Sequence, residues 1–369
     1  MLKISRQFQK IFPKKFGNFW NDIEDYSKID NDLVEITNSF INSESYKFVS
    51  SYWHILNITA YRYLIKNSYK GYGSTLARNY FTMSDLYDPW IDKAMDNASD
   101  TGDIQLNGEM FKKQNRFTYR DSVFYNYLCI LLYCNLKKTK YYDQLDKLQD
   151  KTYTGFDDPY IKIDGHKITT DKVVSLLDYE KIDKAFTLTN INKILEIGAG
   201  SGRLADAILS LNKNKKYVIC DIPPAIFISY KRLQVAFPNK KIALLFNVND
   251  KDEMEKRINE SDISFIFPHQ LDFFSENFID LVLAVDCLHE MDKKTIENYF
   301  KKINKITNKF YFSVWDETLL PYSKKMFSKN VRLNYLKGDY NVPKNWENNF
   351  KENSIFPSNY WCVGFDIKK

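Results

Sequence analysis

The chain has 369 residues, which is long enough for two domains of ordinary size. Hydrophobic residues make up 44% and charged residues 27%, a composition that excludes a wholly disordered chain. The net charge of +6, from 53 basic against 47 acidic residues, is small and evenly spread, so we expect no nucleic-acid partner.

Two further patterns limit where the protein works. No run of about 18 apolar residues occurs, so we expect no membrane span. The basic start MLKISRQFQKIFPKKF lacks the apolar centre of a signal peptide, so we expect a cytoplasmic protein. The five cysteines form no CxxC pair, and we therefore predict neither a zinc site nor a disulfide framework.

The first part of the chain, residues 1–153, is predicted to be a mostly helical cap that binds the acceptor. Apolar residues recur at three- and four-residue spacing in YWHILNITAYRYLI, which starts at Tyr52. They are dense enough in VFYNYLCILLYCNL, which starts at Val123, for a buried helix. We expect both stretches to form helices.

A hairpin and a further helix are predicted next. Residues 160–163 and 166–169 alternate around Asp164-Gly165, and Asp-Gly is a favoured two-residue turn because both positions tolerate positive φ. The run KVVSLLDYEKIDKAF, from Lys172, has a helical pattern.

From Ile194 the pattern changes to alternating strands and helices. Several of the strands are continuous apolar runs, as expected for a parallel sheet that is covered on both faces. We therefore predict that residues 154–369 form an α/β domain with a Rossmann-like doubly wound sheet. The predicted elements are KILEIG, RLADAILSL, YVICDI, FISYKRLQVAF, IALLF, SFIF, DLVLAVD, TIENYFKKINKI, FYFSVWD and YWCVGFDIK.

The first strand of this domain runs into a glycine turn, ILEIGAGSGR. Glycines allow a tight backbone that a ligand can approach closely, and the helix that follows presents free N–H groups. Gly198, Gly200 and Gly202 give G-x-G-x-G, and Arg203 stands where a dinucleotide fingerprint has its third glycine. The next strand ends in Asp221, whose carboxylate suits the two hydroxyls of a ribose. A nucleotide is therefore expected here, and NAD is disfavoured.

With these residues in view, LEIGAGSGR and CDIPP resemble the S-adenosylmethionine-dependent methyltransferases. The later runs FPHQLDFFSENFIDLVLAVDCLHEMD and NYWCVGFD are similar to a narrower group, the putative sugar O-methyltransferases of bacterial surface-polysaccharide (capsule and lipopolysaccharide) pathways. The resemblance covers roughly residues 154–369. It implies S-adenosylmethionine as cofactor, a methyltransferase sheet, and a sugar or nucleotide-sugar acceptor.

The resemblance also implies roles for single residues. The glycines, with Ala199 between them, would pass the methionine part of the cofactor, and Glu196 would orient the turn or the cofactor's amino group. Asp221 would hold the ribose hydroxyls, and Ile222 would lie against the adenine. The loop after the next strand, His269, Gln270 and Leu271, would meet the adenine ring, and Asp286 would lie at the cofactor crevice.

A sugar hydroxyl needs a base before it attacks, because it is a weak nucleophile at neutral pH. His289 follows DLVLAVD, a strand whose carboxyl end should face the crevice, and with Glu290 it resembles the His-Asp pair of plant phenolic O-methyltransferases. We predict His289 as the base, oriented by Asp286, Asp316 or Glu317. A carboxylate partner would raise the pKa of the imidazole.

Three alternatives remain open on the sequence. The acceptor is a small natural product instead of a sugar, or the chain is a cofactor-binding subunit that has lost catalysis. A magnesium ion on Asp286, Glu290 and Asp316 is conceivable, but the spacing does not support it, and no metal is predicted.

Overall fold

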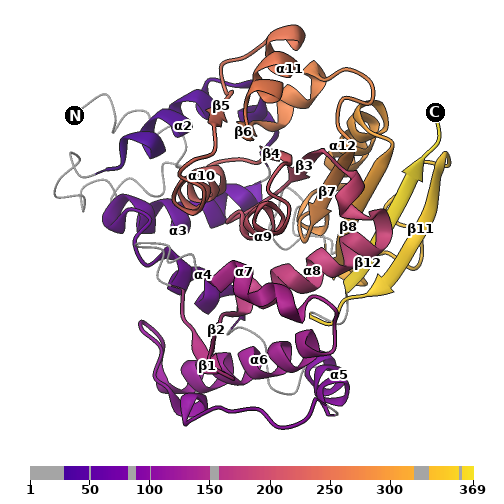
Figure 1. The fold of residues 1–369 in the computed structure, drawn as a ribbon. Coiled ribbons are helices and arrows are strands. Elements are labelled where there is room, and N and C mark those ends of the chain that lie inside the picture. The colour runs from indigo at the N-terminus through magenta and orange to yellow at the C-terminus, as the bar shows by residue number, and fades with distance from the viewer. Residues whose placement is uncertain are drawn as a thin grey trace.

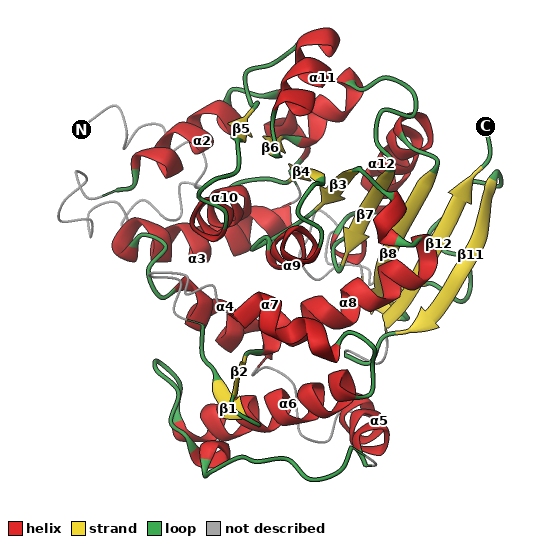
Figure 2. Ribbon diagram, viewed as in Figure 1, coloured by secondary structure: helices red, strands yellow, loops and turns green. Residues whose placement is uncertain are grey.

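The computed structural model describes residues 29–49, 51–81, 89–99, 101–149, 158–319, 332–356 and 360–369. Figures 1 and 2 show a twisted sheet flanked by helices in the second half of the chain, with further helices of the first half beside and below it. The predicted fold class, a Rossmann-like doubly wound sheet joined to a helical N-terminal region, is confirmed.

The central sheet has eight strands in the order β11-β12-β8-β7-β3-β4-β6-β5. The six strands from β8 to β5 are parallel, whereas β12 runs antiparallel to β8 and β11 antiparallel to β12. Their bounds are β3 (Lys193–Ile197), β4 (Lys216–Cys220), β5 (Ile242–Leu244), β6 (Ile263–Ile266), β7 (Leu281–Val285), β8 (Lys309–Trp315), β11 (Trp346–Asn353) and β12 (Tyr360–Ile367).

The order of the strands predicts a ligand crevice at the carboxyl end of β3. The chain leaves β3 toward β4 on one side and later returns to add β7 on the other, so β3 is the point where the winding reverses. Loops on either side of such a point diverge and leave room for a ligand. The glycine turn follows β3 directly and therefore lies at this position.

Helices cover both faces of the sheet because alternate residues of each strand point to opposite sides. One side of the strands packs with α8, α9 and α10 in one apolar core, and the other side packs with α11 and α12 in a second core. The bounds are α8 (Thr170–Phe186), α9 (Arg203–Leu211), α10 (Ala225–Ala236), α11 (Lys251–Glu260) and α12 (Lys293–Ile306).

The N-terminal half is helical, as predicted, and its two expected helices and the hairpin are present. The hairpin pairs Ile161 with Ile168 and turns through Asp164 and Gly165, both at positive φ. The α-helices are α2 (Asn31–Ile41), α3 (Ser51–Asn67), α4 (Tyr72–Phe81), α5 (Pro89–Ala98), α6 (Tyr119–Lys137) and α7 (Leu145–Gln149), and the hairpin strands are β1 (Ile161–Ile163) and β2 (His166–Ile168).

Apolar packing joins the first helices to the sheet. Leu33 and Phe40 of α2 and Leu64 of α3 share one core with Phe227 of α10 and Phe267 after β6. Helices α4 to α6, the hairpin and one side of α8 form a separate core. The boundary predicted at 153/154 therefore does not coincide with a gap in packing, and the division into two domains stays a prediction.

Helix α11 and strand β11 of the second half were not predicted. Helix α11 has the sequence KDEMEKRINE, of which only Met254 and Ile258 are buried. Strand β11, WENNFKEN, lies at the sheet edge and exposes most of its side chains. Both lack an apolar run long enough to reveal them. A small antiparallel pair, β9 (Glu317–Leu319) with β10 (Arg332–Asn334), was also missed.

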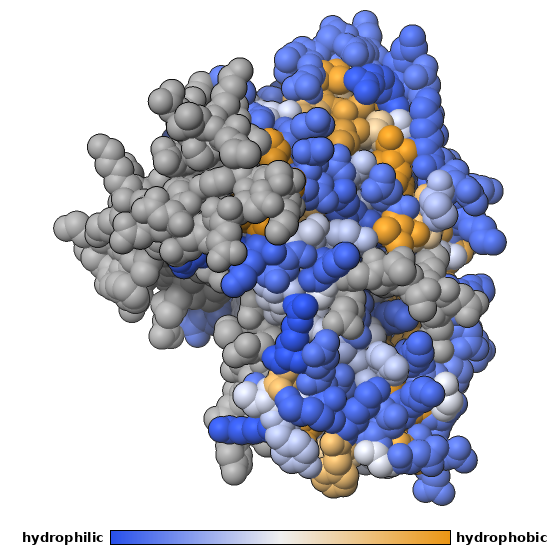
Figure 3. All heavy atoms as spheres, turned by 90° about the vertical axis from the view of Figure 1, so that its left-hand side faces the viewer, coloured by the Kyte–Doolittle hydropathy of each residue, from blue (hydrophilic) through white to orange (hydrophobic). Residues whose placement is uncertain are grey.

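The surface agrees with the composition. The face shown in Figure 3 is mostly hydrophilic over the coloured residues, with hydrophobic areas scattered among them. Among the described residues, no helix is both long enough and apolar enough to cross a bilayer.

Candidate functional site

The glycine turn has three glycines at positive φ, and each meets a different environment. A Cβ atom on Gly198 would lie 2.6 Å from Cβ of Cys287, and one on Gly202 would lie 3.0 Å from Cβ of Ser229. A Cβ atom on Gly200 would meet nothing within 4 Å. Close packing therefore leaves no room for a side chain at Gly198 and Gly202, whereas Gly200 borders open space.

Asp221 lies beside Gly200. Its Oδ2 accepts a hydrogen bond from the Gly200 N–H at 2.8 Å, and its Oδ1 accepts one from the Ile222 N–H at 2.7 Å. Burial raises the pKa of Asp221 to about 6, against the effect of both bonds. A carboxylate has about four lone-pair sites, so each oxygen can accept one further bond from a hydroxyl. The structure therefore leaves Asp221 able to hold a diol.

Glu196 lies inside β3, where 3% of its surface is exposed. Its Oε2 accepts a hydrogen bond from the Tyr217 hydroxyl at 2.8 Å, which fixes the carboxyl group toward β4. Burial raises the pKa of Glu196 to about 7. Its carboxyl group is thus held below the turn, within the core.

The negative charges of four carboxyl groups act on the Cys287 thiol. Burial, together with the negative charges of Glu290, Asp221, Asp286 and Glu196, raises the pKa of Cys287. Burial and the charges of Asp286 and Asp221 also raise the pKa of Glu290 well above its ordinary value. We call Glu196, Asp221, Asp286 and Glu290 the carboxylate cluster; burial raises the pKa of each of its members.

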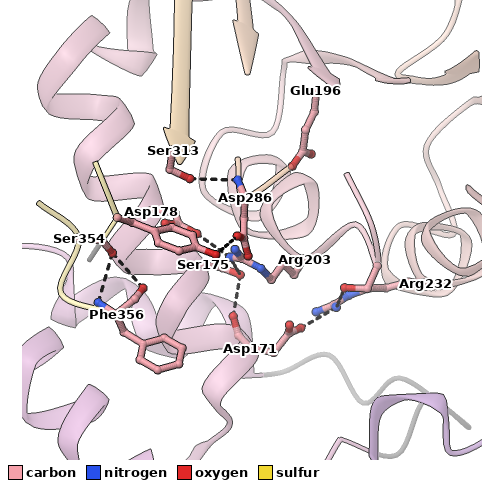
Figure 4. Close-up of polar contacts among 12 residues, drawn as sticks. Asp171, Ser175, Asp178, Glu196, Arg203, Arg232, Asp286, Ser313, Ser354 and Phe356 are labelled. Carbon is pink, nitrogen blue, oxygen red and sulfur yellow. Dashed lines mark hydrogen bonds and ion pairs between the residues drawn. The ribbon is translucent and has the colours of Figure 1, made fainter. Parts of the chain in front are cut away.

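Arg203 begins α9 and balances part of this charge. Its Nη1 lies 2.7 Å from Oδ2 of Asp178 and 3.4 Å from Oγ of Ser175, both on α8. Figure 4 shows the side chains of Arg203 and Asp286 directed toward the same region, with Asp178 and Ser175 beside them. The residue that breaks the dinucleotide fingerprint therefore ties α8 to the glycine turn.

Asp286 ends β7 with an unusual backbone, φ +60°. Its N–H lies 3.0 Å from Oγ of Ser313, a bond drawn in Figure 4. Its Oδ1 accepts a hydrogen bond from the Tyr360 hydroxyl and lies 3.5 Å from Nε2 of His289. Removal of water around it raises the pKa of Asp286, although 40% of its side chain remains exposed.

His289 lies in the short helix Leu288–Glu290 and is enclosed by aromatic rings. Its imidazole contacts Trp315 and Tyr360 edge-on, at 6.1 and 5.4 Å between centroids, and only 6% of the residue is exposed. Burial lowers the pKa of His289 to about 3. We expected Asp316 or Glu317, if it held the ring, to raise this pKa; the described residues show no contact of either acid with the ring, and burial lowers the pKa instead.

Asp316 and Glu317 are not brought to His289. Oδ1 of Asp316 accepts a hydrogen bond from the Trp361 indole N–H at 2.9 Å, whereas the ring of Trp315 contacts His289. Of the three acids predicted to orient His289, the structure brings Asp286 to it. The catalytic role of Asp316 stays a prediction without a contact to His289.

The loop after β6 is bound to the N-terminal half. The Ser45 hydroxyl accepts a hydrogen bond from the His269 N–H at 2.8 Å and lies 3.0 Å from Nδ1 of the same residue. The Gln270 side chain bonds the backbone of Phe267, Leu245 and Val248, and Leu271 is fully buried. These side chains hold the loop, and its contact with adenine stays a prediction.

Ala199 and Ile222 were also predicted to lie beside the cofactor. Ala199 is buried, and its carbonyl accepts the Gly202 N–H at 2.9 Å, which closes the turn. Ile222 is partly buried and packs at the edge of the core beside Asp221. In the described ranges, no three His, Cys, Asp or Glu side chains are arranged to hold a metal ion.

Sequence reasoning missed three residues that shape this site. Tyr217 holds Glu196, Tyr360 holds Asp286, and Ser45 holds His269. Tyr217 and Tyr360 lay in predicted strands, but only the pairing of β4 with β3 and of β12 with β8 shows what they face. Nothing in the sequence near Ser45 signalled its partner, which is 224 residues away.

Comparison with known proteins gives only distant similarities. No family model matches the chain, and no curated protein matches it. Among solved structures, the chain is similar to the pyocyanin biosynthetic protein PhzM, with 11% identity over 64% of this chain and 62% of that one at a TM-score of 0.35. It is also similar to an O-methyltransferase from neocarzinostatin biosynthesis solved with S-adenosyl-L-homocysteine, with 11% identity over 54% and 57% and a TM-score of 0.35.

A third similar structure is the mitomycin 7-O-methyltransferase MmcR, with 10% identity over 77% of this chain and 70% of that one at a TM-score of 0.36. The chain spans less than two thirds of the first two structures. At these identities and scores the similarities say nothing about which residues act, and the site must be argued from its own geometry.

Proposed function

We propose that the protein is a cytoplasmic S-adenosylmethionine-dependent O-methyltransferase whose acceptor is a sugar hydroxyl, of a nucleotide-linked sugar or a capsule or lipopolysaccharide precursor. The observation that carries the proposal is the carboxylate cluster around an open glycine turn at the carboxyl edge of a parallel sheet. The residues present fit this cofactor in shape and in charge.

The fit in shape rests on Gly200 and Asp221. The open space at Gly200 lets a ligand approach the backbone, and Asp221 beside it keeps lone pairs for a ribose diol.

The fit in charge rests on the carboxylate cluster. S-adenosylmethionine carries a positive sulfonium and a positive ammonium group, and the carboxylates of Asp221 and Asp286 would attract this positive charge. NAD carries a negatively charged diphosphate, which the same carboxylates would repel. These two carboxylates therefore favour the sulfonium cofactor.

The acceptor class is supported by the groups near Asp286. Trp315 is partly exposed and packs against Tyr360 with ring centroids 5.0 Å apart. An aromatic ring beside an exposed carboxylate suits a sugar, whose C–H face stacks on the ring while its hydroxyls donate to the acid. A flat aromatic acceptor would use the ring and offer Asp286 a single hydroxyl, whereas a sugar offers several.

The cofactor, when bound, supplies an electrophilic methyl group. The chain has to orient the acceptor in line with that methyl and remove its proton. Asp221 and the glycine turn hold the nucleoside, Glu196 lies under the turn, and the groups at the end of β7 are left to face the acceptor.

Mass spectrometry of candidate acceptors tests this function. The full chain is incubated with deuterated-methyl S-adenosylmethionine and a panel of nucleotide-sugars, capsule oligosaccharides and phenolic natural products. We expect a gain of one labelled methyl on a sugar. If only a phenol gained the labelled methyl group, the acceptor would be a phenolic natural product and not a sugar. If the chain bound the cofactor but methylated no acceptor, it would be a cofactor-binding subunit without catalytic activity.

A further inference from the structure

We propose that Asp286, and not His289, takes the proton from the acceptor hydroxyl, and that Tyr360 and His289 position its carboxylate. This assignment rests on the proposed function, because it concerns the base of that reaction. It reverses the expected relation, in which the acid orients the histidine.

The carboxylate of Asp286 is more accessible than the imidazole of His289. Nδ1 of His289 is buried and has no hydrogen-bond partner in the described part of the chain. The other ring nitrogen, Nε2, faces Asp286. No imidazole nitrogen is therefore left for an acceptor to reach, whereas 40% of the Asp286 side chain is exposed.

Orientation is the second argument. The Tyr360 hydroxyl donates to Oδ1 of Asp286, and Nε2 of His289 lies 3.5 Å from the same oxygen. Both positioning groups act on Oδ1, so neither contact uses Oδ2. Tyr360 and His289 also pack against each other and against Trp315, which fixes them in a rigid aromatic group.

The backbone supports a functional role for this position. Asp286 has φ +60°, a conformation that costs a non-glycine residue roughly 1–2 kcal/mol. Its N–H bonds to Ser313 hold it there. The strained backbone turns the carboxylate out of the line of β7 and toward Arg203 (Figure 4).

The charges around Asp286 come from four elements. Arg203 of α9 attracts its negative form and Tyr360 of β12 bonds it, whereas Asp178 of α8 and Glu290 beside His289 repel it. Desolvation outweighs the Tyr360 bond and the Arg203 charge and raises the pKa of Asp286, which brings the carboxylate closer to the strength a base needs.

The proposed step balances. The acceptor O–H proton moves to Oδ2 of Asp286 while the acceptor oxygen forms a bond to the methyl carbon. The carbon–sulfur bond breaks and its electron pair stays on sulfur, so the sulfonium becomes a neutral thioether. Asp286 then releases the proton to solvent.

Substitutions at the two residues separate the two possible bases. Asp286→Asn keeps the shape, and asparagine tolerates the left-handed backbone, yet it accepts no proton. We expect kcat to fall by a factor of about 10²–10⁴ with less than about threefold change in the affinity for S-adenosylhomocysteine. Asp280→Asn, at the opposite end of β7, is the control and should keep the wild-type kcat.

His289→Gln is the sharper comparison with His289→Ala. A glutamine amide can place an N–H beside Asp286, where Nε2 of His289 lies, but it cannot act as a base. We expect His289→Gln to recover most of the kcat that His289→Ala loses. If both variants fold and both lose about 10²–10⁴-fold in kcat while Asp286→Asn does not, the histidine is the base and the proposal fails.

The pH dependence of kcat in Tyr360→Phe distinguishes a positioning role of Tyr360 from a purely structural one, because a purely structural role would not shift it. The tyrosine bond stabilises the charged form of Asp286, so its loss should raise the pKa of Asp286. The rise of rate with pH should then move to higher pH. An unmoved profile would remove Tyr360 from the assignment.

Chemical labelling tests the assignment without an acceptor. Carbodiimide with glycinamide labels exposed carboxyl groups, and diethylpyrocarbonate labels exposed histidines; peptide mass spectrometry reads both. We expect label on Asp286 that S-adenosylhomocysteine reduces, and none on His289 of the folded chain. Label on His289 with none on Asp286 would overturn the assignment. Calorimetry with S-adenosylhomocysteine separately tells whether the proposed function itself fails.

Discussion

Single residues in the glycine turn carry two separable tasks. Gly198 gives room for Cys287 below the turn, whereas Gly200 gives room on the side that faces open space. The sequence motif shows both as glycine, and only the structure assigns packing to one and ligand approach to the other. An alanine substitution is therefore expected to reduce stability more at Gly198 and to weaken ligand binding at Gly200.

Gly198→Ala and Gly200→Ala form a matched pair. Both add a methyl group at positive φ, but only the first meets an atom at 2.6 Å. We expect Gly198→Ala to lower the free energy of unfolding by about 2–5 kcal/mol and Gly200→Ala by about 1–2 kcal/mol. Gly200→Ala should nevertheless weaken S-adenosylhomocysteine binding by about tenfold or more. Denaturant titration and calorimetry measure the two effects, and equal losses of stability would contradict the division.

Glu196 predicts a pH dependence of stability. Burial raises its pKa from 4.5 to about 7, so between these values the folded chain binds a proton that the unfolded chain releases. The free energy of unfolding should therefore fall as pH rises through this window. Glu196→Gln removes the effect and should gain on the order of 3 kcal/mol over wild type at pH 8, with little difference at pH 4.

Denaturant titrations at several pH values check this expectation. Glu347→Gln, on the exposed edge strand β11, is the control and should parallel the wild type. A Glu196→Gln variant that parallels the wild type from pH 4 to pH 8 would show that Glu196 is not held as a buried acid.

Helices and strands could be predicted from the sequence where their apolar residues form a clear pattern. RLADAILSL and KILEIG have strong patterns, and the structure has α9 and β3 there. KDEMEKRINE buries only two side chains, so its helix depends on the Asp250 cap and on packing that the sequence does not reveal.

The site divides in the same way. Residues next to the glycine motif could be located from the sequence, because strand, turn and helix follow one another along the chain. The partners Tyr217, Tyr360 and Ser45 could not, because strand pairing and the docking of distant helices determine them. The lowered pKa of His289 could not be predicted for the same reason, since its burial depends on rings from β8 and β12.

The link between the N-terminal helices and the loop after β6 can be tested directly. Ser45→Ala removes both contacts with His269. We expect amide exchange in the loop Pro268–Phe273 to quicken about fivefold or more. Ser43→Ala, whose hydroxyl only bonds Phe40 within its own segment, should leave the loop unchanged. Equal exchange in Ser45→Ala and wild type would show that the contact does not hold the loop.

The whole molecule is built so that the first helices complete the core of the sheet. Phe40 packs against Phe267 with ring centroids 5.2 Å apart, and Lys231 of α10 pairs with Asp30 and Asp32 beside α2. The side chain of Asn57 bonds the Pro223 carbonyl, next to Asp221. These contacts make the segment after β4, next to Asp221, depend on residues early in the sequence.

A fragment of residues 154–369 should therefore be less stable than the full chain. Without α2 and α3 it would expose the apolar faces that Leu33, Phe40 and Leu64 cover. We expect a lower thermal midpoint, aggregation, and loss of S-adenosylhomocysteine binding. Differential scanning calorimetry measures the midpoint. A fragment that matches the full chain in midpoint and binding would support two independent domains.

The most direct test of the account is a calorimetric titration of the full chain with S-adenosylmethionine, S-adenosylhomocysteine and NAD. The open turn at Gly200, the diol acceptor Asp221 and the carboxylate of Asp286 predict saturable binding of the first two ligands and none of NAD. Asp221→Ala should weaken binding strongly, and Asp262→Ala, which alters a carboxylate at the amino end of β6, should not. Folded wild-type protein that binds NAD, or binds neither sulfur-containing ligand, would contradict the account.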